Sequence, residues 1–175
     1  MLDALLRRLT EPALEAVAQR FSANAPAFAF AGLALGLAAL PVIAMRFYLP
    51  GLAAVVVSRP IAGLAAAAGR QSGQGDGLVS VFDAVCFAGV PFAFALADPS
   101  RALPAVFLMF GLTAQWTSAL ALGRTWLGNF EILVAIAIAC IFPDRFAIIA
   151  YVLGVLCFVA AGARIAARVA QRRTR

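Results

Sequence analysis

Long apolar runs separated by short polar breaks set the pattern of this chain. Six runs approach the length that a helix needs to cross about 30 Å of hydrocarbon. They lie at roughly 27–45, 48–69, 78–97, 102–122, 127–143 and 145–165. Within lipid, an open chain satisfies its own backbone hydrogen bonds only as a helix. The pattern therefore predicts an all-α integral membrane protein with six transmembrane helices.

The division between the last two runs depends on Pro143. The segment from Ile141 to Arg145 leaves little room for a turn. A proline ends a helix, and Asp144 with Arg145 would otherwise form a charged pair in lipid. We therefore place a break at this proline.

The chain before the first run has a different pattern. Leu2, Leu5, Leu6 and Leu9 recur at helical spacing between charged residues, whereas a signal peptide would have one apolar block. This spacing predicts an amphipathic helix in the membrane interface over residues 1–22, and a disordered basic segment is the alternative. A six-helix transmembrane domain would then occupy 23–168 and a basic C-terminal tail 169–175.

The basic residues are all arginine, and their distribution predicts the topology. Arg59 lies inside a run, and only Arg46, Arg101 and Arg145 fall in loops on one side. The other side holds Arg7, Arg8, Arg20, Arg70, Arg124, Arg164, Arg168, Arg172, Arg173 and Arg175. By the positive-inside rule both termini are cytoplasmic, in a multi-pass protein of a bacterial inner membrane. Anionic headgroups account for the net charge of +6, so no nucleic-acid partner is expected.

Residue composition excludes several kinds of chemistry. The chain has no histidine, and Cys86, Cys140 and Cys157 each lie alone in an apolar run. Zinc or haem ligation and histidine acid–base catalysis are therefore excluded. We expect the cysteines to act as small apolar packing residues.

Three charged residues lie inside the predicted spans: Arg59, Asp83 and Glu131. A charge near the bilayer centre costs about 2.5–3.5 kcal/mol on insertion scales, so such residues usually face a cavity or one another. They are candidates for a functional site. The alternative is a buried ion pair, Arg59 with Asp83 or with Glu131, that only fixes helix packing.

The sequence around these residues resembles a known family. The pieces that carry the resemblance are Ser58-Arg59, Gly63, Arg70, Gly73-Gln74, Gly89-Val-Pro91 and Gly128-Asn-Phe-Glu131. They are similar to the CDP-alcohol phosphatidyltransferases of phospholipid biosynthesis. The resemblance implies six helices after a cytoplasmic amphipathic helix, and a homodimer; a complex with a partner membrane protein is the alternative. The family signature is DxxDGxxAR, eight or nine residues, then GxxxDxxxD. Its aspartates hold two divalent metals on the CDP diphosphate, and the last one activates the acceptor hydroxyl.

This chain departs from that signature at the aspartates. A frame anchored on Arg70 puts the first two aspartates at Ala62 and Ala65, the third at Asp83 and the fourth at Phe87. A frame anchored on Gly89-Val-Pro91 puts the third at Val79 and the fourth at Asp83. Both frames remain open, and in each at most one of the four aspartates survives. One carboxylate cannot assemble a two-metal site.

We therefore expect a non-catalytic or strongly diverged family member, a pseudoenzyme. Asp83 would be the remnant of the catalytic and metal site, Ala62 and Ala65 its degenerate metal positions, and Glu131 an intramembrane partner. Arg59 and Arg70 would bind phosphate, from an anionic or CDP-linked lipid of the membrane. No cofactor is expected, and Mg²⁺ or Mn²⁺ only if activity is retained. The alternatives are an active divergent enzyme that moves a phosphatidyl group from a CDP-linked lipid to an alcohol, and an unrelated small transporter or scaffold.

Overall fold

The computed structural model describes residues 25–71, 77–122 and 128–173, and these ranges contain helices and no strand. The helices are α2 (Ala25–Ala44), α3 (Tyr48–Gln71), α4 (Gly77–Ala97), α5 (Ala102–Leu122), α6 (Asn129–Ile141) and α7 (Phe146–Arg173), with short 3-10 turns η2 (Pro99–Arg101) and η3 (Pro143–Arg145). The prediction of an all-α protein is confirmed for the described ranges. The amphipathic helix predicted at 1–22 lies outside them.

Five of these helices are long and apolar enough to cross a membrane, namely α2, α3, α4, α5 and α7. Helix α6 has 13 residues, which is about 20 Å and shorter than the hydrocarbon core. It begins after Gly128 and stops before Pro143, so the run predicted at 127–143 is only partly helical. The structure thus supports five candidate spans and one shorter apolar helix.

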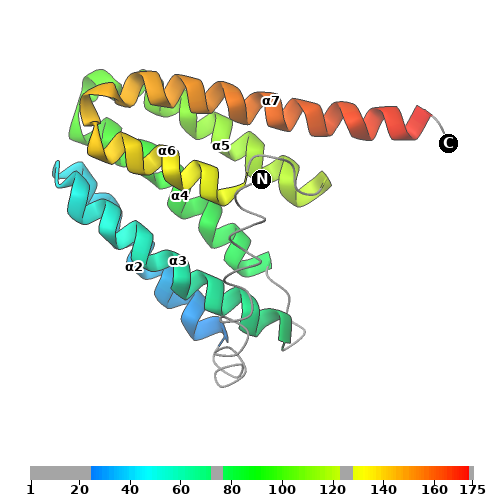
Figure 1. Ribbon diagram of the computed structural model, residues 1–175, viewed down its shortest axis with the longest axis horizontal. Coiled ribbons are helices and arrows are strands. Elements are labelled where there is room, and N and C mark those ends of the chain that lie inside the picture. Colours follow the sequence, from blue (N-terminus) through cyan, green and yellow to red (C-terminus); the bar gives the residue numbers. More distant parts are fainter. Residues whose placement is uncertain (1–24, 72–76, 123–127, 174–175) are drawn as a thin grey trace.

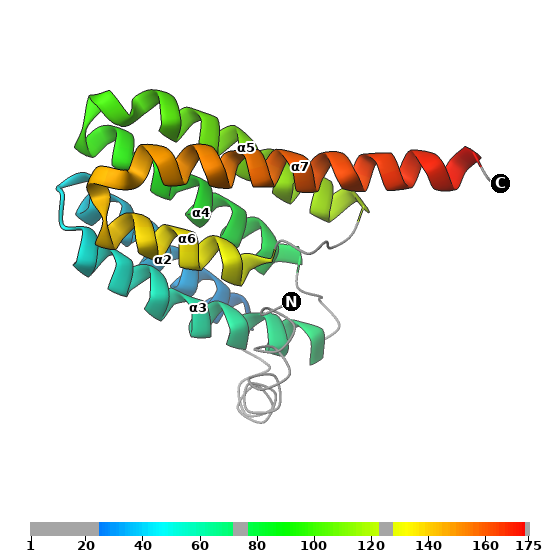
Figure 2. The same ribbon diagram turned by 45° about the horizontal axis from the view of Figure 1, so that its top comes forward.

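The last helix is longer than the sequence pattern predicted. The final span was expected to end near 165, whereas α7 continues to Arg173 and has 28 residues. Residues 169–173 of the predicted basic tail are therefore helical. Figures 1 and 2 show this end of α7 running out beyond the other helices.

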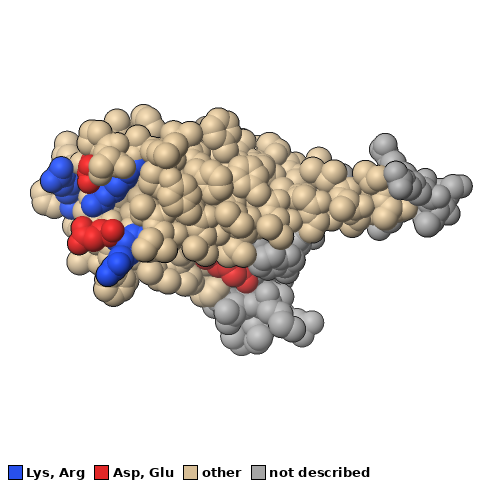
Figure 3. Space-filling model, turned by 90° about the horizontal axis from the view of Figure 1, so that it is seen from above, with Lys and Arg blue, Asp and Glu red and all other residues tan. Residues whose placement is uncertain are grey.

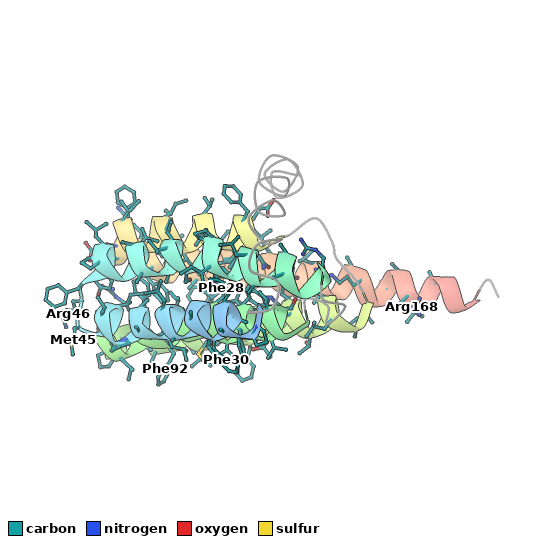
Figure 4. The ribbon with its side chains drawn as sticks, turned by 90° about the horizontal axis from the view of Figure 1, so that it is seen from below. Phe28, Phe30, Met45, Arg46, Phe92 and Arg168 are labelled. Carbon is teal, nitrogen blue, oxygen red and sulfur yellow. The ribbon has the colours of Figure 1, made fainter. Side chains whose placement is uncertain are left out.

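The helices form a bundle in which neighbours in sequence are mostly neighbours in space. Helix α2 packs against α3 and α4, α4 packs against α5, and α5 packs along α7, while α6 lies against α3 and α7 (Figure 1). Stacked aromatic rings fill one part of the core, with Phe94 between Phe146 (centroids 4.3 Å apart) and Tyr48 (5.1 Å). Large side chains such as Phe30 and Phe92 point outward (Figure 4). Such a surface suits lipid.

Glycines on α2 bring this helix close to both of its neighbours. A Cβ atom on Gly36 would lie 2.6 Å from Cys86 Sγ of α4, and a Cβ atom on Gly32 would lie 3.4 Å from the backbone nitrogen of Ala62 on α3. Small residues at this four-residue spacing allow helices to approach closely in membranes. The contact fixes the rotation of α3 and α4, and with it the side chains that these two helices turn toward each other.

Loops that the sequence assigned to one side of the membrane meet at one end of the bundle, where Figure 3 shows blue and red side chains together. Arg101 forms ion pairs with Asp98 (3.3 Å) and Asp144 (3.7 Å), and its Nη1 donates to the Tyr48 hydroxyl (3.2 Å). Arg46 Nε donates to the backbone oxygen of Ala97 (3.1 Å). These contacts join the α2–α3, α4–α5 and α6–α7 connections.

The turn between α2 and α3 is closed by an arginine in the left-handed region. Arg46 has a φ of 68°. Its N–H donates to the Ile43 oxygen (2.8 Å), and the next N–H, that of Phe47, donates to the Val42 oxygen (3.1 Å). This pair of bonds is a Schellman motif, in which glycine is the usual residue at the left-handed position. The hydrogen bond from the Arg46 side chain to the Ala97 backbone oxygen gives a reason for arginine in place of glycine at this position.

Candidate functional site

Two of the three charged residues predicted inside spans form an ion pair between helices. Arg59 lies in the middle of α3 and Asp83 in the second turn of α4. Arg59 Nη1 donates to Asp83 Oδ1 at 2.8 Å, and the two side chains are 17% and 12% exposed. Of the two acids that the sequence offered as partners of Arg59, the structure selects Asp83.

Neighbouring side chains fix the orientation of the Arg59 guanidinium. Its Nε and Nη2 donate to Ser58 Oγ (3.3 and 3.2 Å), and Ser58 Oγ donates to the Val55 backbone oxygen (2.7 Å). The guanidinium carbon lies 4.7 Å from the centre of the Phe87 ring, a cation–π arrangement. Phe87 in turn stacks on Trp116 of α5 (5.4 Å). The guanidinium group of Arg59 is thus contacted at its edge by Ser58 and on its face by the Phe87 ring.

A third helix completes the surroundings of Asp83. Asn129 Nδ2 donates to Asp83 Oδ2 at 3.1 Å, so each carboxylate oxygen accepts a hydrogen bond from a different helix. Asn129 is the first residue of α6, and a helix N-terminus favours a nearby negative charge. Asp83 is buried and Asn129 is exposed. The cluster therefore runs from the interior to the surface of the bundle.

The Glu131 side chain has a different partner from the one that the sequence suggested. Its Oε2 accepts a hydrogen bond from the backbone N–H of Gly128 at 3.0 Å, which caps the start of α6. It is not the partner of Arg59, whose bonds go to Ser58 and Asp83. Glu131 instead supports the helix end that carries Asn129.

The remaining predicted site residues also lie on α3. Arg70 is exposed and follows Arg59 by eleven residues, which is about 16 Å along a helix. Ala62 and Ala65 are buried. Ala62 lies on the face of α3 that meets Gly32 of α2. The structure thus brings together Arg59 and Asp83 but not Arg70.

A second buried arginine was not singled out in the sequence. Arg164 was counted with the loop arginines, yet on α7 it is only 6% exposed. Its Nη1 donates to three acceptors on α5: the Gln115 backbone oxygen (2.7 Å), Gln115 Oε1 (3.1 Å) and Ser118 Oγ (2.6 Å). The sequence signal that could have indicated a buried Arg164 is a pair of polar residues in an apolar helix, Gln115 and Ser118, three positions apart.

Asn129 and Ser58 are site residues that sequence reasoning did not assign a role. Both occurred in the short pieces that carried the family resemblance, but neither is charged, so the cost of burial did not draw attention to them. Asn129 acquires its role from Asp83 on another helix, whereas Ser58 accepts from the side chain of its neighbour Arg59 on the same helix. Only the packing of the helices reveals the partner of Asn129.

The residues present do not fit a two-metal centre. Both oxygens of Asp83 are already bonded to Arg59 and Asn129. Among residues 25–71, 77–122 and 128–173, no three His, Cys, Asp or Glu side chains lie close enough to hold a metal ion. Mg²⁺ sites need several oxygen ligands. What the cluster offers is a guanidinium held beside a carboxylate, and guanidinium groups bind phosphate well.

The fold and the buried ion pair define a helical, multi-pass membrane protein. Its sequence is similar to that of the inner membrane protein YnjF of Escherichia coli (strain K12), with 28% identity over 159 residues covering 77% of this chain and 77% of the relative. No protein-family model matches the chain. No solved structure matches it either.

Proposed function

We propose that this protein is a non-catalytic member of the CDP-alcohol phosphatidyltransferase type that binds a phosphate-bearing headgroup at Arg59. It would lie in the inner membrane with both termini cytoplasmic, and α6 would complete a sixth crossing together with its flanking residues. The similarity to an inner membrane protein supports the location. The Arg59–Asp83 contact is the observation that carries the functional proposal.

The contact favours one register of the family signature. If the α3 residue facing Asp83 occupies the first aspartate position, Arg59 stands at that position and Ala62 at the second. Gly63 and Ala66 then coincide with the glycine and the alanine of DxxDGxxAR, Ala67 and not Arg70 stands at its arginine, and Asp83 is the fourth aspartate. The spacer before Gly75 becomes one residue shorter than the family's. In this register Arg59, Ala62 and Val79 replace three of the four aspartates.

This replacement changes the charge of the site. The family's carboxylates attract divalent cations, which then neutralise a diphosphate. Here a fixed guanidinium supplies positive charge without a metal, and Asp83 balances it in a setting of low dielectric. A phosphate could bind to Arg59 through charge-assisted hydrogen bonds. Transfer of a phosphatidyl group would have neither the two metals nor an unengaged base.

Two measurements test the proposal. Purified protein in detergent is incubated with CDP-diacylglycerol, Mg²⁺ or Mn²⁺ and a panel of alcohols, and we expect no release of CMP above that of a protein-free control. CMP release that Asp83→Asn abolishes would show an active enzyme and overturn the non-catalytic assignment.

The binding part is tested separately by thermal-shift titration with CDP, CDP-diacylglycerol and phosphatidic acid. We expect a saturable shift with at least one of them, and its loss in an Arg59→Gln variant that still melts cooperatively. Arg145→Gln is the matched control, because Arg145 is exposed in the loop before α7. Absence of any saturable signal, or equal loss in both variants, would refute binding at Arg59.

A further inference from the structure

The C-terminal turns of α7 are a second part of the molecule whose charged side chains need an explanation. Helix α7 packs along α5, and bonds from Arg164 to Gln115 and Ser118 join the two helices near the end of α5. Residues 165–170 are all exposed. Figure 1 shows this part of the helix beyond the bundle. These exposed turns of α7 therefore face the surroundings of the protein.

If α7 begins at one edge of the hydrocarbon core, its length brings these turns to the opposite membrane surface. From Phe146 to Arg164 the helix rises about 27 Å, close to the thickness of the hydrocarbon core. Arg168 follows one turn later, and the whole helix of 28 residues is about 42 Å long. With its first residue near one edge of the core, α7 carries Arg168 and the residues after it into the opposite headgroup layer.

The side chains in these turns suit that layer. Ile165 and Val169 are 54% and 48% exposed, and Arg168 is exposed one position before Val169. In the part of the chain that the structure describes, nothing pairs with Arg168. Figure 4 shows Arg168 on the extended part of α7. Apolar side chains next to arginine are typical of helices that contact acyl chains and phosphates together.

The charge of this segment has one sign only. Arg164, Arg168 and Arg172 recur every four residues, Arg173 and Arg175 follow, and no acidic residue occurs from Phe146 to the end of the sequence. We propose that the exposed residues 165–170 of α7, with the arginines that follow them in the sequence, bind the headgroups of anionic phospholipids in the adjacent leaflet. The occupant is a lipid rather than a nucleic acid or a protein, because the surface begins at the edge of the hydrocarbon core and pairs arginines with exposed aliphatic side chains.

The test is titration of the full-length protein in a neutral detergent with phosphatidylglycerol or phosphatidylcholine, read out by native mass spectrometry. We expect wild type to retain phosphatidylglycerol preferentially, and Arg168→Gln and Arg172→Gln each to weaken it about fivefold. The double variant should lose about 25-fold if the two effects add. Arg168→Lys should keep most of the affinity, and Arg145→Gln, at the other end of the bundle, should keep all of it. Raising the salt concentration from 50 to 500 mM should reduce the ratio of the affinity for phosphatidylglycerol to the affinity for phosphatidylcholine.

Arg168 lies on an exposed turn, so the melting temperature of Arg168→Gln without added lipid should equal that of wild type, and the double variant is compared only where it melts cooperatively. Unchanged phosphatidylglycerol affinity in the folded double variant would overturn the proposal. Equal affinity of wild type for phosphatidylglycerol and phosphatidylcholine would overturn it as well. These outcomes are independent of Arg59, which the Arg59→Gln titration tests by itself.

Discussion

Arg59 of α3 and Asp83 of α4 are joined by an ion pair of 2.8 Å inside the bundle, with both side chains less than one-fifth exposed. The pair is not isolated, because Ser58, Phe87 and Asn129 bind one partner or the other. Its geometry links three helices. A buried pair of this kind fixes the relative position of the helices that carry it, whatever ligand it also serves.

Loss of one partner of this pair should strongly destabilise the protein. Asp83→Asn leaves the Arg59 guanidinium without its counter-charge, and breaking a buried ion pair costs about 3–5 kcal/mol. Reversible unfolding in mixed micelles would measure the change in free energy of unfolding. The double variant Arg59→Gln/Asp83→Asn removes both charges and should be destabilised by less than the sum of the two single variants. An additive double variant would mean that the two residues do not interact.

Removal of the Asn129 amide should have a smaller effect in the same direction. Asn129→Ala takes one hydrogen bond from the Asp83 carboxylate, and bonds to charged groups contribute about 1.5–3 kcal/mol. Asn129→Asp should be worse than alanine, since it places a second carboxylate beside Asp83. The same unfolding measurement applies. An aspartate variant as stable as wild type would contradict the contact.

Close packing of α5 on α7 should tolerate no side chain at Gly111. A Cβ atom there would lie 3.0 Å from both the Cα and the oxygen of Gly154, which are backbone atoms that cannot move aside cheaply. Gly111→Ala should therefore cost about 1–3 kcal/mol. Gly162→Ala is the matched control, because nothing lies within 4 Å of its Cβ position. That control should be neutral or slightly stabilising, by up to about 1 kcal/mol; equal losses in the two variants would contradict the packing.

The left-handed turn at Arg46 predicts the relative stability of two variants and the wild type. Arg46→Ala loses the bond to the Ala97 oxygen but keeps a side chain at a φ of 68°. Arg46→Gly loses the same bond and relieves the steric cost, so it should be more stable than the alanine variant by about 1 kcal/mol. Wild type should be close to the glycine variant, because the lost bond contributes a similar amount. An alanine variant more stable than glycine would rule out this conformation.

Acid should remove the contribution of Ser100 to stability. The hydroxyl of Ser100 donates to Asp98 Oδ1 (2.8 Å) and its N–H to the same oxygen (3.0 Å); these bonds, with Arg101 adding to them, hold the pKa of Asp98 below its ordinary value of 3.8. A lowered folded-state pKa stabilises the fold above the unfolded value and loses that effect as pH falls through the folded value. The melting temperature of Ser100→Ala should therefore lie below that of wild type at pH 7, and the difference should shrink below about pH 3.8. A constant difference across this range would contradict the assigned bonds.

At some residues the sequence alone did not predict the structure. It predicted a membrane crossing at 127–143 but not that the helix within this run would have only 13 residues, between Gly128 and Pro143. It placed Arg164 with the loop arginines, yet acceptors on α5 bury that side chain inside the bundle. In both cases a hydropathy pattern averages over residues, whereas helix ends and polar partners are set by individual atoms.

Hydropathy is a property of each segment by itself, so the sequence determined the all-helical fold, the membrane setting and the candidate charges inside it. Which of those charges meet depends on how each helix is rotated about its axis. That rotation is decided by contacts between helices, such as Gly36 of α2 against Cys86 of α4. Only the tertiary structure could therefore pair Arg59 with Asp83, add Asn129 to them, and leave Arg70 apart.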